Sequence, residues 1–208
     1  MNTTDHGFLT QAALVAVAVL PAAPAAATTY LSTDAAQRSL FPQAQSFEET
    51  PIALDDAQRQ AVARIAGPQA GHGALHLWTA RNDRNVLGYV FIDEVIGRQD
   101  FITYAVGIDT NGKLRPVEIL EYRESHGGEI RNKRWLAQFD GRASPKELRF
   151  GTDIKNIAGA TLSSEHVTAG VRRIFAIWQS LFATPGAPRT EVRGAMIEAA
   201  PAKAPTRT

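Results

Sequence analysis

The segment GATLSS, residues 159–164, combines residue types that suit the binding of a phosphate group. Gly159 and Ala160 are small enough to let the backbone approach a ligand closely. A helix is predicted to follow directly, and the first N–H groups of a helix lack internal partners and carry the positive end of its dipole. Because Thr161 and Ser163 add hydroxyl groups at this anion-attracting end, the spacing favours a phosphate-bearing ligand.

The same six residues also suit an ordinary helix N-terminus. In that interpretation Ser163 or Ser164 caps the helix, and Gly159 only turns the chain. Turns of small residues before helices are common, so the spacing alone leaves both interpretations open.

A second candidate segment is the polar loop ESHGG, which follows a predicted strand and consists of Glu124, Ser125, His126, Gly127 and Gly128. Binding residues are concentrated on loops, which makes these side chains and amides candidates for ligand contacts. The alternative is a solvated turn in which the glycines only provide flexibility.

The composition excludes several other chemistries. The chain contains no cysteine, which rules out disulfides, thiolate-bound iron–sulfur clusters and a CxxCH haem attachment. The histidines His72, His76, His126 and His166 lack a ligand spacing to carboxylates, so no metal site is predicted. No G-x-S-x-G nucleophile elbow is present. The formal net charge is only +1, and the sequence contains no basic stripe that would indicate binding to nucleic acid.

Helical patterns open the chain after its apolar N-terminus. Thr33 is the candidate N-cap of a short helix over DAAQRSLF, which Pro42 ends. Apolar residues at helical spacing predict a second helix over residues 54–66, before Gly67 and Pro68 stop it.

From residue 74 the apolar period changes to two. This predicts a meander of about four strands, ALHLWTAR, VLGYVFIDEVI, DFITYAVGID and KLRPVEILEY. Asn111 and Gly112 tolerate the positive φ of a tight hairpin between the last two strands. Pro116 indicates an edge or a bulge near the start of the fourth strand.

Helices also follow the meander. Asn132 is a candidate cap for a short helix that contains Trp135 and Phe139. The strongest helical stripe comes after GATLSS, at Val167, Val171, Ile174, Phe175, Trp178, Leu181 and Phe182. The order of elements predicts an α+β domain, in which a twisted, largely antiparallel sheet packs against the N-terminal helices and the helix after Thr161.

These segments resemble the FMN-binding domain of the flavin-carrying periplasmic subunits of Na+-translocating NADH:quinone oxidoreductases and Rnf complexes, and of nitric-oxide-reductase regulator proteins. GATLSS before a helix is similar to that family's S/T-G-A-T motif, whose threonine a dedicated flavin transferase esterifies to the FMN phosphate. VGIDTNGKLRPVEILEYRESHGGEIRN looks like the family's strand–turn–strand core and the loop after it. The leading YLSTDAAQRSLFPQAQSFEE is similar as well.

The resemblance implies a covalent phosphothreonyl-FMN at Thr161. It places the cofactor beside Gly159, Ala160, Leu162 and Ser163. It also implies that the loop residues Glu124, Ser125, His126, Gly127 and Gly128 border the isoalloxazine ring. Trp135 follows this loop closely enough to reach the edge of the ring, although its helical spacing is more typical of a core residue.

Two positions depart from the family's pattern. The family commonly has an aspartate six residues before the threonine, where this chain has Lys155, and the nearest acid is Asp153. The residue before the glycine is usually serine or threonine and is Ala158 here. Non-covalent FMN at the same site is therefore the alternative to the ester bond.

The two ends of the chain predict export and a tail. Residues 8–20 form an apolar run that is short for a membrane span, and Ala25 and Ala27 form an A-x-A cleavage site. Residues 1–27 are therefore predicted to be a signal peptide. Because no Lys or Arg precedes the run, a retained N-terminal membrane anchor is the alternative. Residues 28–183 then form the FMN-binding domain, and residues 184–208 a mobile tail rich in Pro and Ala.

The resemblance and the predicted signal peptide together imply a periplasmic flavoprotein that relays electrons between a membrane redox partner and another carrier, the flavin performing the redox chemistry. The implied partners are a flavin transferase and a membrane electron-transfer protein. No catalytic residue is predicted, which favours a subunit or carrier over a stand-alone oxidoreductase. A reversible FMN-binding or sensing module and a structural subunit with an empty pocket are the alternatives.

Overall fold

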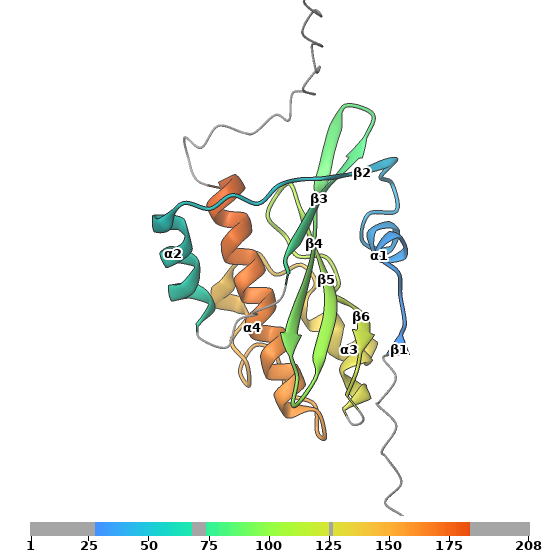
Figure 1. Ribbon diagram of the computed structural model, residues 1–208, viewed down its shortest axis with the longest axis vertical. Helices are drawn as coiled ribbons and strands as arrows, with labels where there is room; N and C mark the ends of the chain where they lie inside the picture. The colour runs from blue at the N-terminus through green and yellow to red at the C-terminus, as the bar shows by residue number, and fades with distance from the viewer. Residues whose placement is uncertain (1–27, 68–73, 125–126, 184–208) are drawn as a thin grey trace, which may run out of the picture.

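The computed structural model describes residues 28–67, 74–124 and 127–183 (Figure 1). The predicted signal peptide, the predicted tail, His72, Ser125 and His126 lie outside the described residues. Within the three described segments, no helix combines the length and the apolar character needed to cross a membrane.

A six-stranded antiparallel sheet forms the centre of the domain, in the order β1-β6-β5-β4-β3-β2. Its strands are β1 (Thr28–Thr29), β2 (Ser46–Glu49), β3 (His76–Asn82), β4 (Asn85–Ile96), β5 (Phe101–Asp109) and β6 (Glu118–Tyr122). Strands β3 to β6 are the predicted meander, which is confirmed. The predicted hairpin turn is also present: Gly112 has a φ of +77°, and Asp109 Oδ1 accepts hydrogen bonds from the N–H groups of Asn111 and Lys113.

Helices cover both faces of this sheet, which confirms the predicted α+β class. The four α-helices of the described segments are α1 (Thr33–Leu40), α2 (Asp56–Ala66), α3 (Lys133–Leu136) and α4 (Thr161–Trp178). Figure 1 shows α1 on one side of the sheet and α2 and α4 on the other. Short 3-10 turns flank α3, and a π-turn over Gln179–Ala183 continues α4.

Two apolar clusters lie on the two faces of β4. Val90 and Ile92 pack with Leu40 of α1, whereas Phe91 and Val95 belong to the larger cluster that contains α4. Successive side chains of a strand point to opposite faces of the sheet, so side chains on both faces of β4 are buried. This explains why the central strands are apolar at almost every position.

The predicted stripe on the last helix is confirmed by burial. Five of its side chains are at most 7% exposed: Val167, Val171, Ile174, Phe175 and Trp178. Leu181 and Phe182 lie in the π-turn and pack partly buried against the same core. The ring of Phe182 stacks on that of Tyr89 with 4.0 Å between centroids, and Gln58 Nε2 donates to the Ser180 carbonyl at 2.9 Å.

The helix starts differ in detail from the prediction. The cap of α1 is Ser32, whose hydroxyl accepts from the Ala35 N–H at 3.2 Å, so the prediction of Thr33 as the cap was wrong by one residue. Helix α2 begins at Asp56 rather than 54, because Asp55 and Gln58 form a reciprocal capping box. Asn132 caps α3 as predicted.

A buried polar group joins α4 to the sheet. The Asp93 carboxylate on β4 is 0% exposed and accepts hydrogen bonds from the Tyr104 hydroxyl, at 2.6 Å, and from the Arg173 guanidinium. A Cβ atom at Gly170 would lie 2.0 Å from the Tyr104 hydroxyl oxygen, so α4 needs a glycine where it crosses this group. Burial raises the pKa of Asp93 above its usual value, and the charge of Arg173 opposes that effect.

Candidate functional site

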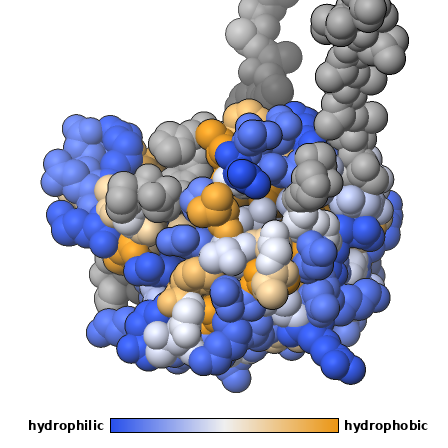
Figure 2. All heavy atoms as spheres, turned by 90° about the horizontal axis from the view of Figure 1, so that it is seen from below, coloured by the Kyte–Doolittle hydropathy of each residue, from blue (hydrophilic) through white to orange (hydrophobic). Residues whose placement is uncertain are grey.

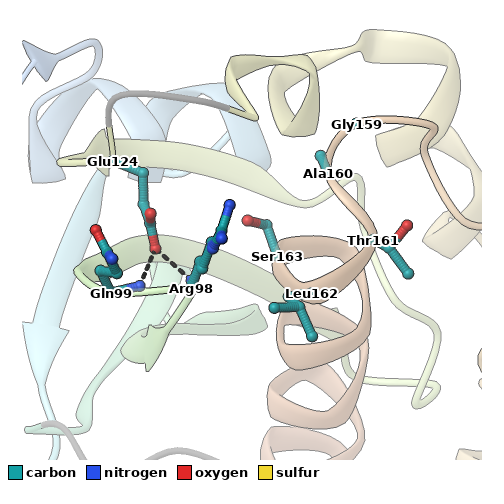
Figure 3. A pocket seen from close by; sticks show the side chains of 8 residues that line it. All are labelled: Arg98, Gln99, Glu124, Gly159, Ala160, Thr161, Leu162 and Ser163. Atoms are coloured by element: carbon teal, nitrogen blue, oxygen red, sulfur yellow. Dashed lines mark hydrogen bonds between the residues drawn. The ribbon is translucent and has the colours of Figure 1, made fainter.

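A cavity of about 560 Å³ opens at one end of the sheet, where α4 begins, β6 ends and β4 turns into β5. Eight residues line it: Arg98, Gln99, Glu124, Gly159, Ala160, Thr161, Leu162 and Ser163 (Figure 3). Six of them belong to the set predicted from the sequence, and only Arg98 and Gln99 were not predicted. Cofactor pockets typically enclose about 300–1,000 Å³, so the cavity is large enough for a nucleotide-sized ligand.

The start of α4 forms one wall of the cavity. Ala160 is the N-cap residue, and no side chain in the described part of the chain caps this helix. Ser163 and Ser164 lie inside the first turn, where the Ser164 hydroxyl donates to the Thr161 carbonyl at 2.9 Å. The interpretation of these serines as caps is therefore wrong, and the first N–H groups of α4 lack a side-chain acceptor among the described residues.

Thr161 is the first residue of α4, and its side chain is exposed. Gly159 precedes it with a φ of +88°, a left-handed conformation that favours glycine, and no described atom lies within 4 Å of the position that a Cβ would take. Leu162, which is 46% exposed, lies beside Thr161 at the rim. A threonine hydroxyl is thus accessible at the positive end of a helix, next to open space.

Ser163 is buried, whereas Thr161 is exposed. It is 4% exposed, and its hydroxyl oxygen lies 3.4 Å from the hydroxyl oxygen of Tyr122. Burial raises the pKa of the Tyr122 phenol above its usual value, so this group remains protonated. Gly127 has a φ of +90°, and a Cβ there would lie 2.4 Å from the Tyr122 hydroxyl oxygen, whereas Gly128 has open space around it.

Glu124 lines the cavity and holds the opposite wall in place. Its Oε1 atom accepts hydrogen bonds from three consecutive backbone N–H groups, those of Arg98, Gln99 and Asp100, at 2.7 Å for Gln99 and 3.1 Å for Asp100. Gly97 allows this approach, because a Cβ there would lie 2.6 Å from the same oxygen. The Glu124 carboxylate therefore fixes the turn between β4 and β5.

His166 fixes the same turn from α4. Its Nδ1 lies 2.5 Å from the Ile96 carbonyl oxygen and 3.1 Å from that of Gly97. A carbonyl oxygen can only accept, so Nδ1 carries the proton. His76, another histidine considered for a metal, lies elsewhere, with its Nδ1 3.3 Å from Glu49 Oε1.

Trp135 and the acid near Thr161 lie apart from the cavity lining. Trp135 is 5% exposed in the core, and its Nε1 donates to the Lys155 carbonyl at 2.6 Å. Asp153 pairs with Arg149 through two side-chain contacts of 2.8 and 3.1 Å, and these hydrogen bonds lower the pKa of Asp153 to about 2. The acid displaced from the family's position thus stabilises its own turn.

The cavity end of the molecule also exposes apolar surface. Among the described residues, the large hydrophobic side chains that are exposed are Ile96 at 45% and Leu162 at 46%. Ile96 ends β4 at the turn, and Leu162 lines the cavity. Figure 2, which views the molecule from below Figure 1, shows apolar side chains gathered among hydrophilic ones.

An uncapped helix start, an exposed hydroxyl and a nucleotide-sized cavity are the features of a phosphate-anchored cofactor site. Residues 97–176 match the FMN-binding domain family, and this segment contains all eight residues that line the cavity. This match confirms the resemblance to the FMN-binding domain family seen in the motifs of the chain. A similar protein is one of the subunits of the Na(+)-translocating ferredoxin:NAD(+) oxidoreductase complex of Acetobacterium woodii. It is 25% identical over 156 residues that cover 70% of this chain and 73% of that protein.

Proposed function

We propose that this protein is an exported electron-transfer flavoprotein whose FMN is joined through its phosphate to the Thr161 hydroxyl. The observation that carries the proposal is the start of α4, where an exposed threonine begins an uncapped helix at the mouth of the cavity. A phosphate bound there is stabilised by free N–H groups and by the helix dipole. The similar A. woodii protein belongs to an oxidoreductase complex, which supports a role in electron transfer.

The residues that line the cavity, together with the loop that follows Glu124, fit the parts of FMN. Gly159 and Ala160 would lie against the phosphate, because they keep the chain before α4 free of bulk. Glu124, Gly127 and Gly128, with the adjacent Ser125 and His126, would border the isoalloxazine ring, and Leu162 would cover it from the rim. The bound FMN supplies the electron-accepting chemistry, and the protein binds, orients and tunes it.

The proposal extends to the rest of the chain. The domain comprises residues 28–183, and residues 1–27 direct it to the periplasm or anchor it to the membrane. A flavin transferase attaches the cofactor, and a membrane redox protein exchanges electrons with it. No side chain is assigned a catalytic step, so the protein acts as a subunit or carrier.

Intact mass spectrometry of the chain exported beside an active flavin transferase tests the attachment. In the attachment the Thr161 oxygen bonds to the flavin-bearing phosphorus of a dinucleotide donor such as FAD, the P–O–P bond of the donor breaks, AMP leaves and Thr161 loses its hydroxyl proton. The mature chain therefore gains the mass of one FMN less one water. Thr161→Ala is expected to lose this mass and the denaturation-resistant yellow colour, whereas Thr161→Ser keeps a hydroxyl group and is expected to retain part of both.

Each other outcome contradicts a stated part of the proposal. FMN that acid releases, with little change in Thr161→Ala, indicates reversible binding and rejects the ester. Full covalent flavin in Thr161→Ala places the link on another residue. A wild-type chain without flavin, and without affinity for free FMN, has only a structural role.

A further inference from the structure

Arg98 is the single cation among the described residues that line the cavity. It lies in the turn between β4 and β5 and faces the site from a different element than Thr161. Figure 3 shows its guanidinium group directed into the space between Glu124 and Ser163. Neither the family match nor the motif at α4 assigns a role to this side chain.

The backbone of Arg98 is held by contacts that leave its side chain free. Glu124 Oε1 accepts the Arg98 N–H, and the Gly97 N–H donates to the Asp100 carbonyl at 2.8 Å, which closes the turn. His166 attaches the preceding residues to α4. The Arg98 guanidinium has no hydrogen bond or ion pair within the described segments, and the side chain is exposed. The turn thus presents an unpaired positive charge to the cavity.

The neighbouring carboxylate does not neutralise this charge by direct pairing. Glu124 directs the oxygen nearest the turn to three backbone N–H groups instead of the guanidinium. These three hydrogen bonds fix the orientation of the carboxylate. The Glu124 carboxylate therefore positions the turn and leaves the Arg98 guanidinium free to interact with a ligand in the cavity.

Given the proposed function, the phosphate of FMN would lie at the start of α4, and the ring would extend through the cavity that the turn also lines. We propose that Arg98 stabilises the negative charge that the isoalloxazine ring acquires on reduction and thereby raises its midpoint potential. On reduction of a bound FMN by two electrons and one proton, the proton would go to N5, and one negative charge would remain over N1 and the C2 carbonyl oxygen. Guanidinium is planar, permanently charged and rich in N–H donors, which suits this pair of acceptors. Charge near N1 is a recognised means of tuning a flavin.

Redox titration of the full-length holoprotein tests the proposal. Dithionite supplies the electrons, mediator dyes equilibrate the flavin, and absorbance follows its reduction. At a fixed potential, Arg98→Gln is expected to raise the ratio of oxidised to reduced flavin about tenfold. For a two-electron couple this corresponds to a midpoint potential about 30 mV lower than that of the wild type. Arg98→Lys is expected to stay near the wild type, and Arg98→Glu to shift further than Arg98→Gln.

The matched control is Arg84→Gln, which removes the same charge from an exposed position in the turn between β3 and β4. Its potential is expected to equal that of the wild type. Because Arg98 is exposed, the difference between Arg98→Gln and wild type is expected to shrink as salt is added.

Three results would overturn the inference, and they are distinguishable. Equal potentials in Arg98→Gln and wild type, at equal flavin content, mean that Arg98 does not act on the ring. Reduced flavin content at unchanged potential means that Arg98 contacts the phosphate instead. A wild-type chain that carries no flavin contradicts the proposed function itself, and the inference with it.

Discussion

Gly127 and Gly128 follow β6 side by side, yet they occupy different environments. Gly127 has a left-handed backbone, and its missing Cβ leaves room for the hydroxyl group of Tyr122. Gly128 has no described atom within 4 Å of the position that its Cβ would take. Since Tyr122 also contacts Ser163, the conformation of this loop is connected to the start of α4.

This contrast predicts unequal effects of two alanine substitutions. Gly127→Ala is expected to destabilise the protein by at least about 1–2 kcal/mol, the cost of a left-handed residue with a side chain, and to lower Tm by about 2–8 °C. Gly128→Ala is expected to stay within about 0.5 kcal/mol of the wild type. Thermal unfolding and flavin content of the two variants check this. Equal stabilities would show that Tyr122 does not require the space at Gly127.

Single residues of the site were predictable only where a local motif carries them. The sequence identified Thr161 and its neighbours, because a small-residue turn and the helix that uses it are adjacent in the chain. It did not identify Arg98, which reaches the cavity only through the pairing of β4, β5 and β6. A usable signal existed: alternate strands of a meander end at the same edge, so the polar turn GRQD after β4 had to lie near Glu124 at the end of β6.

At the scale of elements, α4 connects the cavity with the sheet. Its first turn lines the site, His166 holds the turn between β4 and β5, and Arg173 reaches Asp93 inside the core. The Asp93 carboxylate is 0% exposed, and the Arg173 side chain is 15% exposed. Removing one partner of such a buried pair typically costs about 3–5 kcal/mol, because the other charge remains in the core.

Arg173→Met is therefore expected to lose about 3–5 kcal/mol of stability at neutral pH. The loss is expected to be smaller near pH 4. Burial already raises the pKa of Asp93, and removing the charge of Arg173 raises it further. A carboxyl group whose pKa is higher in the folded than in the unfolded state holds more protons when folded, so stability falls as pH rises above the unfolded pKa.

Urea unfolding of wild type and Arg173→Met at pH 7 and at pH 4 measures the loss of stability at each pH. The matched control is Arg38→Met, which breaks an exposed pair with Asp34 at 3.6 Å and is expected to cost less than about 1 kcal/mol. Equal losses at the two pH values in Arg173→Met would mean that Asp93 does not take up a proton in the core.

The elements themselves were predicted unequally for a physical reason. The meander and the stripe of α4 were correct, because burial imposes a period on consecutive side chains. Strands β1 and β2 were not predicted, since they are only two and four residues long and pair with strands distant in sequence. The start of α2 depends on the bonds between Asp55 and Gln58, which periodicity does not reveal.

At the scale of the whole molecule, both faces of the sheet are covered, and the candidate cofactor site lies at one end of it. The other end of α4 completes the core instead. There the π-turn Gln179–Ala183 places Phe182 on Tyr89 and offers the Ser180 carbonyl to Gln58 of α2. These contacts support the proposed C-terminal limit of the domain near residue 183, beyond which residues 184–208 are the proposed tail.

Two truncations distinguish these segments. Deleting residues 184–208 is expected to leave Tm and flavin content unchanged. Deleting residues 179–208 removes the stacked pair of Phe182 and Tyr89, the hydrogen bond from Gln58 and the partly buried Leu181. Aromatic pairs and hydrogen bonds contribute about 0.5–1.5 kcal/mol each, so this deletion is expected to cost at least about 1 kcal/mol and lower Tm by at least about 2–4 °C. Calorimetry compares the two chains, and a large loss from the shorter deletion alone would move the domain boundary beyond residue 183.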